Sequence, residues 1–334
     1  MFRLHHVLGT LVSLSPLSCA LAAPDEAPAP LHLTAPDLDL IGVPAGTFQM
    51  GSDDKDPQRF PSELKVTTVS LSQPFWLGKT EVTRGQWEAV MGPITEPTFI
   101  GSPKDLATLA SDLPMADVTW GQAIAFCDKL TARERIAGRL KPGYVFSLPS
   151  EAQWEYACRA GTTGLMPAST ADRDATIWYM KTAGPWTYSM GAKLNPVAEK
   201  KANAWGFHDM LGNVREWVLD PAAPYPGGSV TDPLPLKGVF PGKPQKEEIE
   251  LRIMRGGCWI DGERGTRAAA RDWADPTKYA AAPEKKPDGK PGSDFRGGTV
   301  GFRLALISEK MRAAVDPFVR TLATPPVAVA PAKP

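Results

Sequence analysis

The stretch FHDMLGNVREWVLDP, from Phe207 to Pro221, is the segment that most constrains how this chain can fold. Its centre, Gly212 and Asn213, predicts a tight turn, because both residue types tolerate the backbone angles that turns require. The chain of 334 residues contains 34 prolines and 30 glycines, which is high for a helical protein. We therefore expect a fold dominated by loops and turns, with large aromatic side chains in its core.

Further segments that contain glycines and aromatic residues occur before and after this one. They are GVPAGTFQMGS (Gly42–Ser52), LPSEAQWEYACRAG (Leu148–Gly161), IMRGGCW (Ile253–Trp259) and GGTVGFRLA (Gly297–Ala305). Together with the first stretch they resemble, in the same order, the signature segments of the formylglycine-generating enzyme, or sulfatase-modifying factor, family. The resemblance covers most of Leu38 to Ile307. It implies a compact, loop-rich variant of the C-type lectin fold.

Hydrophobic spacing predicts the secondary structure independently of that resemblance. Helices are predicted over Thr80–Met91 and Thr119–Ala137, and Ser150 with Gln153 predicts the N-terminal cap of a third helix. Short strands are predicted at Phe48–Met50, Val66–Leu71, Leu251–Met254 and Thr299–Leu304. No long alternation of strands and helices and no internal repeat is visible in the sequence, so an α+β fold is preferred over a doubly wound sheet.

The first residues, 1–22, have the pattern of an export signal. Arg3 precedes an apolar run, and a small-residue cleavage site ends at Ala22. We expect cleavage there, a periplasmic location and no membrane span in the mature chain. Lipidation at Cys19 is disfavoured, because Pro16 stands where a lipobox usually has leucine.

The rest of the chain divides into three parts. Residues 23–37 are rich in proline and alanine and predict a flexible leader. The family-like domain is expected over 38–307, with exposed insertions at Ala222–Glu250 and Ala280–Ser293. Residues 308–334 predict a short helix and a disordered tail. The equal numbers of basic and acidic side chains, 37 each, argue against nucleic acid as a partner.

The resemblance raises the question of copper chemistry. Active family members oxidise a cysteine of a client sulfatase to formylglycine with two copper-binding thiolates, which follow an Arg-Gly-Gly-Ser segment. This chain has Cys258 in place of that serine, and the following loop, Ile260–Thr266, contains no cysteine. A single thiol cannot form a two-coordinate Cu(I) site, so neither copper nor formylglycine-generating activity is expected. We expect Cys258 to be a small buried residue.

The other two cysteines of the mature chain are Cys127 and Cys158. They could pair in an oxidising periplasm. The resemblance implies a different partner for Cys158, just after the GFR motif, but this chain has Leu304 there. A Cys127–Cys158 disulfide, with Cys258 as the remaining thiol, is therefore our hypothesis.

The resemblance also implies a calcium site within GNVREW. The matching positions are Gly212, Asn213, Val214 and Glu216. Oxygen ligands on a tight glycine-containing loop suit Ca²⁺. The alternative is that Asn213 caps a turn and Glu216 pairs with Arg215 or another arginine. In either case the role would be structural, since nothing nearby supplies a nucleophile or a base.

A third group of residues lies in the segments that line the family's substrate groove. Its arginines are Arg255, Arg267, Arg271, Arg296 and Arg303. Guanidinium groups suit carboxylates and carbonyls, and the alternative is that Arg255 and Arg303 satisfy buried acids. We expect a partner-binding groove formed mainly by Trp259, Asp261, Arg267, Arg271 and Trp273, with Glu263 and Asp272 nearby.

These observations favour a binding protein over an enzyme. Only four histidines are present, and no Cys/His or Ser/His/Asp triad can be assembled. We expect an exported, non-catalytic regulator that engages a periplasmic protein or the periplasmic domain of a membrane protein. The layout is similar to that of the family member that regulates type VI secretion by promoting a membrane threonine kinase. The alternatives are an oxidoreductase-type maturation enzyme, similar to family members that act on the pyoverdine chromophore, and a calcium-dependent carbohydrate-binding protein.

Overall fold

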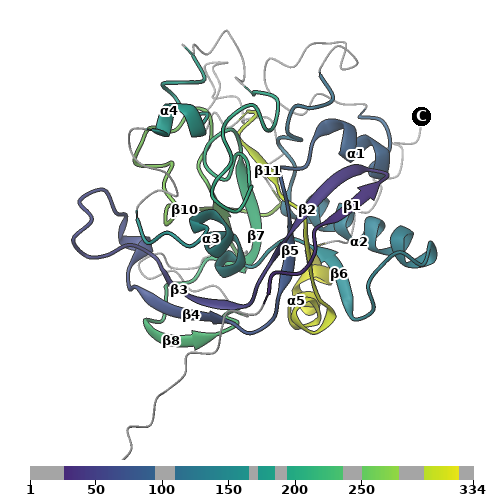
Figure 1. Cartoon of the computed structure of the whole chain (residues 1–334), viewed down its shortest axis with the longest axis horizontal. Coiled ribbons are helices and arrows are strands. Elements are labelled where there is room, and N and C mark those ends of the chain that lie inside the picture. The colour runs from purple at the N-terminus through teal and green to yellow at the C-terminus, as the bar shows by residue number, and fades with distance from the viewer. Residues whose placement is uncertain are drawn as a thin grey trace, which may run out of the picture.

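The computed structural model describes residues 26–94, 110–164, 172–184, 194–235, 250–277 and 297–322. These residues form three small sheets and a few short helices, joined by irregular connections (Figure 1). The predicted α+β class and the abundance of loops are confirmed. Within the described part of the chain, no helix is both long and apolar enough to cross a membrane.

The largest sheet has five strands and joins the beginning of the domain to its end. Its order is β1 (Leu31–Thr34), β2 (Asp37–Val43), β5 (Phe75–Gly78), β12 (Ala305–Ser308) and β6 (Tyr144–Ser147). Every neighbouring pair is antiparallel. Because β12 lies between β5 and β6, the sheet closes only when the late part of the chain has been added.

A four-stranded sheet carries most of the candidate site. Its order is β10 (Arg271–Ala274), β9 (Arg252–Arg255), β7 (Arg215–Pro221) and β11 (Val300–Phe302). The third sheet consists of β3 (Gly46–Met50), β4 (Thr67–Leu71) and β8 (Gly228–Thr231). Three of the predicted strands therefore appear, as β3, β4 and β9, with bounds that differ by at most two residues.

The fourth predicted strand, Thr299–Leu304, is divided between two sheets. β11 ends at Phe302, and β12 begins at Ala305 in the five-stranded sheet. Arg303, between them, is buried and forms an ion pair with Glu216 at 2.8 Å. The change of sheet is thus held by an ion pair that hydrophobic alternation cannot reveal.

Three helices begin with the same capping arrangement. The helices are α1 (Arg84–Met91), α2 (Trp120–Ile136) and α3 (Glu151–Arg159). In each, the hydroxyl of the capping Thr or Ser accepts the backbone N–H of the third helical residue, a glutamine. The side chain of that glutamine accepts the backbone N–H of the capping residue. The predicted Ser150 cap is confirmed. The helix predicted from Thr80 begins only at Arg84, because the capping residue before it is extended. The other helical elements are η1 (Pro61–Glu63), α4 (Arg173–Thr176) and α5 (Glu309–Leu322).

The core is formed by buried side chains of the sheets and of the longer helices. α2 and α5 pack on β6, while α3 packs against β3, β7 and β9 (Figure 1). Trp120 and Trp217 are fully buried, and their indole N–H groups donate to the carbonyls of Val218 and Val118 at 2.8 and 2.9 Å. The expectation of a core built on large aromatic side chains is confirmed.

Two predicted boundaries are corrected by the structure. The supposed leader, residues 23–37, contains β1, and the carbonyl of Ala29 accepts the indole N–H of Trp76 at 2.7 Å. The supposed insertion Ala222–Glu250 contributes β8, which pairs with β4. Strand pairing with distant residues orders both segments, although their composition is typical of linkers. Residues 1–25, the insertion Ala280–Ser293 and the tail after 322 lie outside the described residues.

The disulfide hypothesis is also corrected. Cys127, Cys158 and Cys258 are all buried free thiols. Cys127 and Cys158 pack in the hydrophobic core, where a thiol behaves as a small hydrophobic side chain. Burial raises the pKa of Cys158 to about 12 and raises the pKa of Cys127 still further.

Candidate functional site

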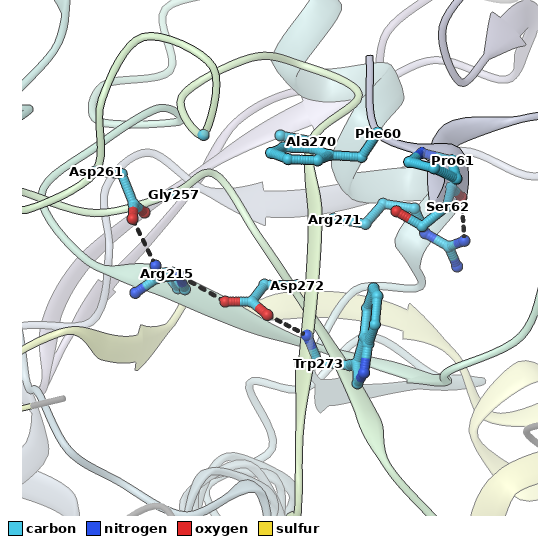
Figure 2. A pocket seen from close by; sticks show the side chains of 11 residues that line it. Phe60, Pro61, Ser62, Arg215, Gly257, Asp261, Ala270, Arg271, Asp272 and Trp273 are labelled. Carbon is cyan, nitrogen blue, oxygen red and sulfur yellow. Dashed lines mark hydrogen bonds and ion pairs between the residues drawn. The ribbon is translucent and has the colours of Figure 1, made fainter. Parts of the chain in front are cut away.

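A cavity of about 480 Å³ opens beside β10 (Figure 2). One wall comes from the turn before and within η1, another from β10, and a third from the loop that follows β9. Its lining residues are Phe60, Pro61, Ser62, Arg215, Gly257, Asp261, Gly265, Ala270, Arg271, Asp272 and Trp273. The volume lies within the usual range of ligand-binding cavities.

Arg215 connects two of these walls. Its guanidinium donates to the sulfur of Cys258 at 2.9 Å and to Oδ1 of Asp261 at 2.7 Å. Its Nε lies 3.1 Å from Oδ2 of Asp272 on β10. Figure 2 shows this row of Asp261, Arg215 and Asp272 along one side of the cavity. The loop after β9 is therefore joined to β10 through one side chain.

Arg271 belongs to a second, buried ion-pair system beneath the cavity. Its Nε and Nη2 donate to the two carboxylate oxygens of Glu151 at 2.6 and 2.8 Å, and its Nη1 donates to the carbonyl of Ser62 at 2.8 Å. Arg255 donates to Glu151 at 2.8 Å and to Glu155 at 2.5 Å. These contacts join η1, α3 and β10, so the floor of the cavity is built from buried ion pairs. They also confirm that Arg255 satisfies buried acids.

Two residues that we expected in the groove lie elsewhere. Trp259 is buried, and its indole N–H donates to the carbonyl of Gly298 at 2.6 Å. Arg267 is also buried and forms ion pairs with Glu63 at 2.5 Å and Asp56 at 3.1 Å. Both are structural, and the expected groove is corrected accordingly. Arg296 lies outside the described residues.

Asp261, Arg271 and Trp273 do line the cavity, together with Asp272. Sequence reasoning missed Arg215 as a cavity residue and missed the Phe60 to Ser62 wall. Arg271 and Ser62, which touch, are 209 positions apart. No local signal in the sequence could have brought these segments together.

Cys258 is buried, as expected. Burial raises the pKa of its thiol to about 12, despite the nearby guanidinium of Arg215. The position of the loop after Arg255 is held by Asp261, whose Oδ2 accepts the backbone N–H of Cys258 at 2.9 Å. The loop thus presents a carboxylate and no accessible thiolate to the cavity.

The GNVREW turn forms a separate region. Gly212 has φ +83°, and a Cβ there would lie 2.1 Å from the carbonyl oxygen of Trp178, so only glycine fits. Both oxygens of Glu81 are used by this turn. They accept the backbone N–H of Val214 at 3.0 Å and the side-chain amide of Asn213 at 2.8 Å.

Glu216 follows this turn at the start of β7. Its carboxylate accepts the indole N–H of Trp154 at 2.7 Å and the guanidinium of Arg303 at 2.8 Å. Pairing with another arginine was our alternative to calcium binding, and the structure shows that pair. The side chain also joins α3 to the segment between β11 and β12.

The neighbourhood of this turn contains more acid than base. Glu81, Asp209 and Glu216 are buried around Arg303. Burial, followed by the Asp209 and Glu216 carboxylates, raises the pKa of Glu81 well above its usual value. Burial likewise raises the pKa of Asp209. A bound cation would favour the ionised forms of these carboxyl groups.

The donor atoms at the turn fit a hard cation in their chemistry. Oδ2 of Asp209 accepts the N–H of Ala198 at 2.7 Å, whereas its buried Oδ1 has no hydrogen-bond partner. Within the described ranges, no three His, Cys, Asp or Glu side chains are grouped so as to hold a metal ion. Calcium here would therefore have to combine one or two carboxylates with backbone carbonyls.

Comparison with known proteins identifies the family to which the chain belongs. A family model described as a sulfatase-modifying factor enzyme 1-like domain matches residues 30–306. Chaperone protein LppX of Paenibacillus barcinonensis is 26% identical over 263 residues, which cover 66% of this chain and 79% of that protein. The formylglycine-generating enzyme of Mus musculus is 25% identical over 283 residues, which cover 70% of this chain and 68% of the enzyme.

A solved structure of PvdO from Pseudomonas aeruginosa shares the fold. The two structures align with a TM-score of 0.60 and 23% identity, over 84% of this chain and 98% of that one. Together, these likenesses confirm the fold that the sequence motifs implied.

Proposed function

Because the chain belongs to the sulfatase-modifying factor enzyme 1-like family, with its variant of the C-type lectin fold, we propose that it is a non-catalytic protein that binds a partner protein in the cavity beside β10. The observation that carries the proposal is the wall after β9. In that wall, Asp261 and Arg215 form an ion pair that lines the cavity. The sulfur of Cys258, the single cysteine of the loop, is buried.

The chemistry of this wall supports binding rather than oxidation by thiolates. A thiol must be deprotonated and accessible to act as a nucleophile or a soft metal ligand. Cys258 meets neither condition, since it is buried and its pKa is raised to about 12. Asp261 and Asp272 are each paired with Arg215, which orients both carboxylates. We therefore propose them as recognition groups.

The surroundings of the cavity support a protein partner. Phe60 and Trp273 provide aromatic surface, which is enriched where proteins bind one another. Met180 is 57% exposed, and its Cε would lie 3.7 Å from a Cβ at Gly262, next to Asp261. An exposed methionine beside an aromatic cavity gives an adaptable apolar margin. One relative is named a chaperone, a class of proteins that acts by binding other proteins.

The partner that we propose is a periplasmic protein or the periplasmic domain of a membrane protein. The export signal expected at residues 1–22 supports this location. The finer proposal is that the chain promotes a type VI secretion threonine kinase. This rests on the similarity of its layout to the family member with that role.

The proposal is tested by recovering partners from a periplasmic extract with the mature protein. Trp273→Ala removes aromatic surface from the cavity and should abolish recovery of the partner. The matched control is Ile136→Ala, which removes a side chain that is 89% exposed at the end of α2 and does not line the cavity. Equal recovery by wild type and Trp273→Ala, with equal melting temperatures, would refute the proposal.

A second part of the proposal is that calcium stabilises the GNVREW turn. The excess of buried carboxylates and the unpartnered Oδ1 of Asp209 support it. When bound, the ion would supply charge neutralisation, held by the predicted positions Gly212, Asn213, Val214 and Glu216 with help from Asp209. Calcium at 100 times its dissociation constant should raise the free energy of unfolding by about 2.7 kcal/mol.

Isothermal titration with calcium, and with magnesium for comparison, tests this second part. We expect one calcium ion per chain and its loss in Asp209→Asn. If the apoprotein prepared with a chelator binds no calcium and melts at the same temperature with and without it, the calcium proposal is wrong. The partner proposal does not depend on that result.

A further inference from the structure

The exposed carboxylates of the cavity beside β10 indicate which kind of partner side chain it binds. We propose that it recognises a basic side chain, lysine or arginine, of the partner, held between the Asp272 carboxylate and the ring of Trp273. This inference rests on the proposed function and adds the chemistry of the ligand. It follows from the exposure of the charged groups, their pairing and the aromatic walls.

The charge that solvent can reach in the cavity is mainly negative. The side chain of Asp272 is 44% exposed and that of Asp261 is 21% exposed, whereas Arg215 is 14% exposed. The side chain of Arg271, the other guanidinium in the lining, is only 1% exposed. A ligand that enters therefore meets carboxylate oxygen before it meets guanidinium.

The part of this wall that solvent reaches carries more carboxylate than guanidinium. Arg215 serves both Asp261 and Asp272, so that two carboxylates share one guanidinium. Arg271 lies beneath this row, where Glu151 binds it with both oxygens and also accepts from Arg255. A cation from the partner would pair with the second carboxylate of the exposed row, and complementary charge favours the correct partner.

An anionic ligand fits this arrangement less well. The Nε and both terminal nitrogens of Arg215 already contact Asp272, Cys258 and Asp261. Arg271 donates to Glu151 and, beyond it, to the carbonyls of Ser62 and Ala223. A carboxylate or phosphate would have to compete with the carboxylates already bound to these guanidinium groups, whereas a cation would not.

The aromatic walls favour the same ligand. Trp273 follows Asp272 directly on β10, and Figure 2 shows its ring standing at the edge of the cavity. A tryptophan face attracts ammonium and guanidinium groups. On the opposite wall, the guanidinium of Arg264 already lies 4.1 Å from the ring centre of Phe60. That ring is therefore already covered by a guanidinium, and Trp273 is the ring that we propose for the cation of the ligand.

The inference is tested with three short acetylated and amidated peptides, observed by NMR titration of the full mature protein. They are identical except for one central residue, which is arginine, its neutral isostere citrulline, or glutamate. The arginine peptide should bind roughly five to ten times more tightly than the citrulline peptide at low salt. Added salt should reduce that difference, because exposed charges are screened.

Asp272→Asn should remove most of the preference for arginine over citrulline. The matched control is Asp275→Asn, which makes the same change of charge just beyond β10 at a residue outside the cavity lining. This control should keep the preference of the wild type. Both variants should have the melting temperature of the wild type, which shows that a loss of binding is not caused by unfolding.

Three outcomes would overturn the inference. They are equal binding of arginine and citrulline peptides, tighter binding of the glutamate peptide, and absence of arginine binding at millimolar concentration. If Trp273→Ala loses the extracted partner while Asp272→Asn retains it fully, the cavity still binds a protein but does not select a cation. In that case the proposed function stands and only the present inference is wrong.

Discussion

Two ion-pair systems meet at β10, and they use the same groups in different surroundings. Arg271 joins the buried system with Glu151, Glu155 and Arg255, whereas the next residue, Asp272, joins the exposed row with Arg215. Figure 2 shows these two neighbouring side chains directed apart. The buried side chains of the first system are at most 3% exposed, while the exposed carboxylate of Asp272 is 44% exposed.

The difference in burial assigns a different role to each system. A buried ion pair cannot lose one partner without leaving a charge in the protein interior, so it holds the fold together. An exposed pair contributes little to stability and remains accessible to a ligand. The first system therefore builds the floor of the cavity, and the second provides its recognition groups.

The sharpest test of this division removes a charge from the buried system. Arg255→Met leaves the carboxylate of Glu155 with one guanidinium fewer in a fully buried position. We expect a loss of about 3 to 5 kcal/mol in the free energy of unfolding, measured by urea denaturation. The double variant Arg255→Met with Glu155→Gln should recover part of the loss. A loss below about 1 kcal/mol in the single variant would contradict the structural role.

Asp117 is a third kind of acidic group, buried and bound by backbone N–H groups rather than by a guanidinium. Asp117 accepts the N–H groups of Gly298 and Thr299 at 2.7 and 3.3 Å. Burial raises its pKa from 3.8 to about 7. The folded state therefore binds a proton more tightly than the unfolded state. The resulting stability is fully present below pH 3.8 and is lost as the pH rises towards 7.

Asp117→Asn removes this titration and should flatten the pH dependence of stability. Between the two pKa values, the wild type should lose on the order of 4 kcal/mol from this group alone. The measurement is the free energy of unfolding of both proteins at several pH values from 4 to 8. Parallel curves for the two proteins would show that Asp117 ionises normally in the folded state.

The smallest effect on stability is expected in the exposed row. Arg215→Met removes the link between Asp261 and Asp272 but leaves both carboxylates near solvent. The free energy of unfolding should fall by about 1 kcal/mol or less. A loss as large as that of Arg255→Met would mean that the row is structural, and the division between the two systems would fail.

The sequence predicted those features that depend on nearby residues. Ser150 with Gln153 identified the start of α3, because a capping box is complete within four positions. The lack of a second cysteine after Cys258 was visible directly. Composition was misleading where pairing partners were distant, as for β1 within the supposed leader and β8 within the supposed insertion. Linker-like residues became strands there because a neighbouring strand supplied their hydrogen bonds.

The candidate site was predicted only in part, for the same reason. Asp261, Arg271 and Trp273 were assigned to the groove and line the cavity, whereas Trp259 and Arg267 were assigned to it and are buried. Arginine and tryptophan occur both in binding surfaces and in satisfied interiors. Residue type alone does not tell whether an arginine or tryptophan lines a cavity or is buried, because this depends on which carboxylate or carbonyl the folded chain brings next to it.

By itself, the sequence determined the family, the capped helices and the absence of a thiolate pair, because each is a property of residue identity and short spacing. The tertiary structure decided which arginines are buried and which charges face the cavity. Those outcomes depend on contacts such as Arg271 with Ser62, 209 positions apart. Burial changes the energy of a charge far more than its neighbours in the chain do, and burial is settled only when the sheets and helices have packed.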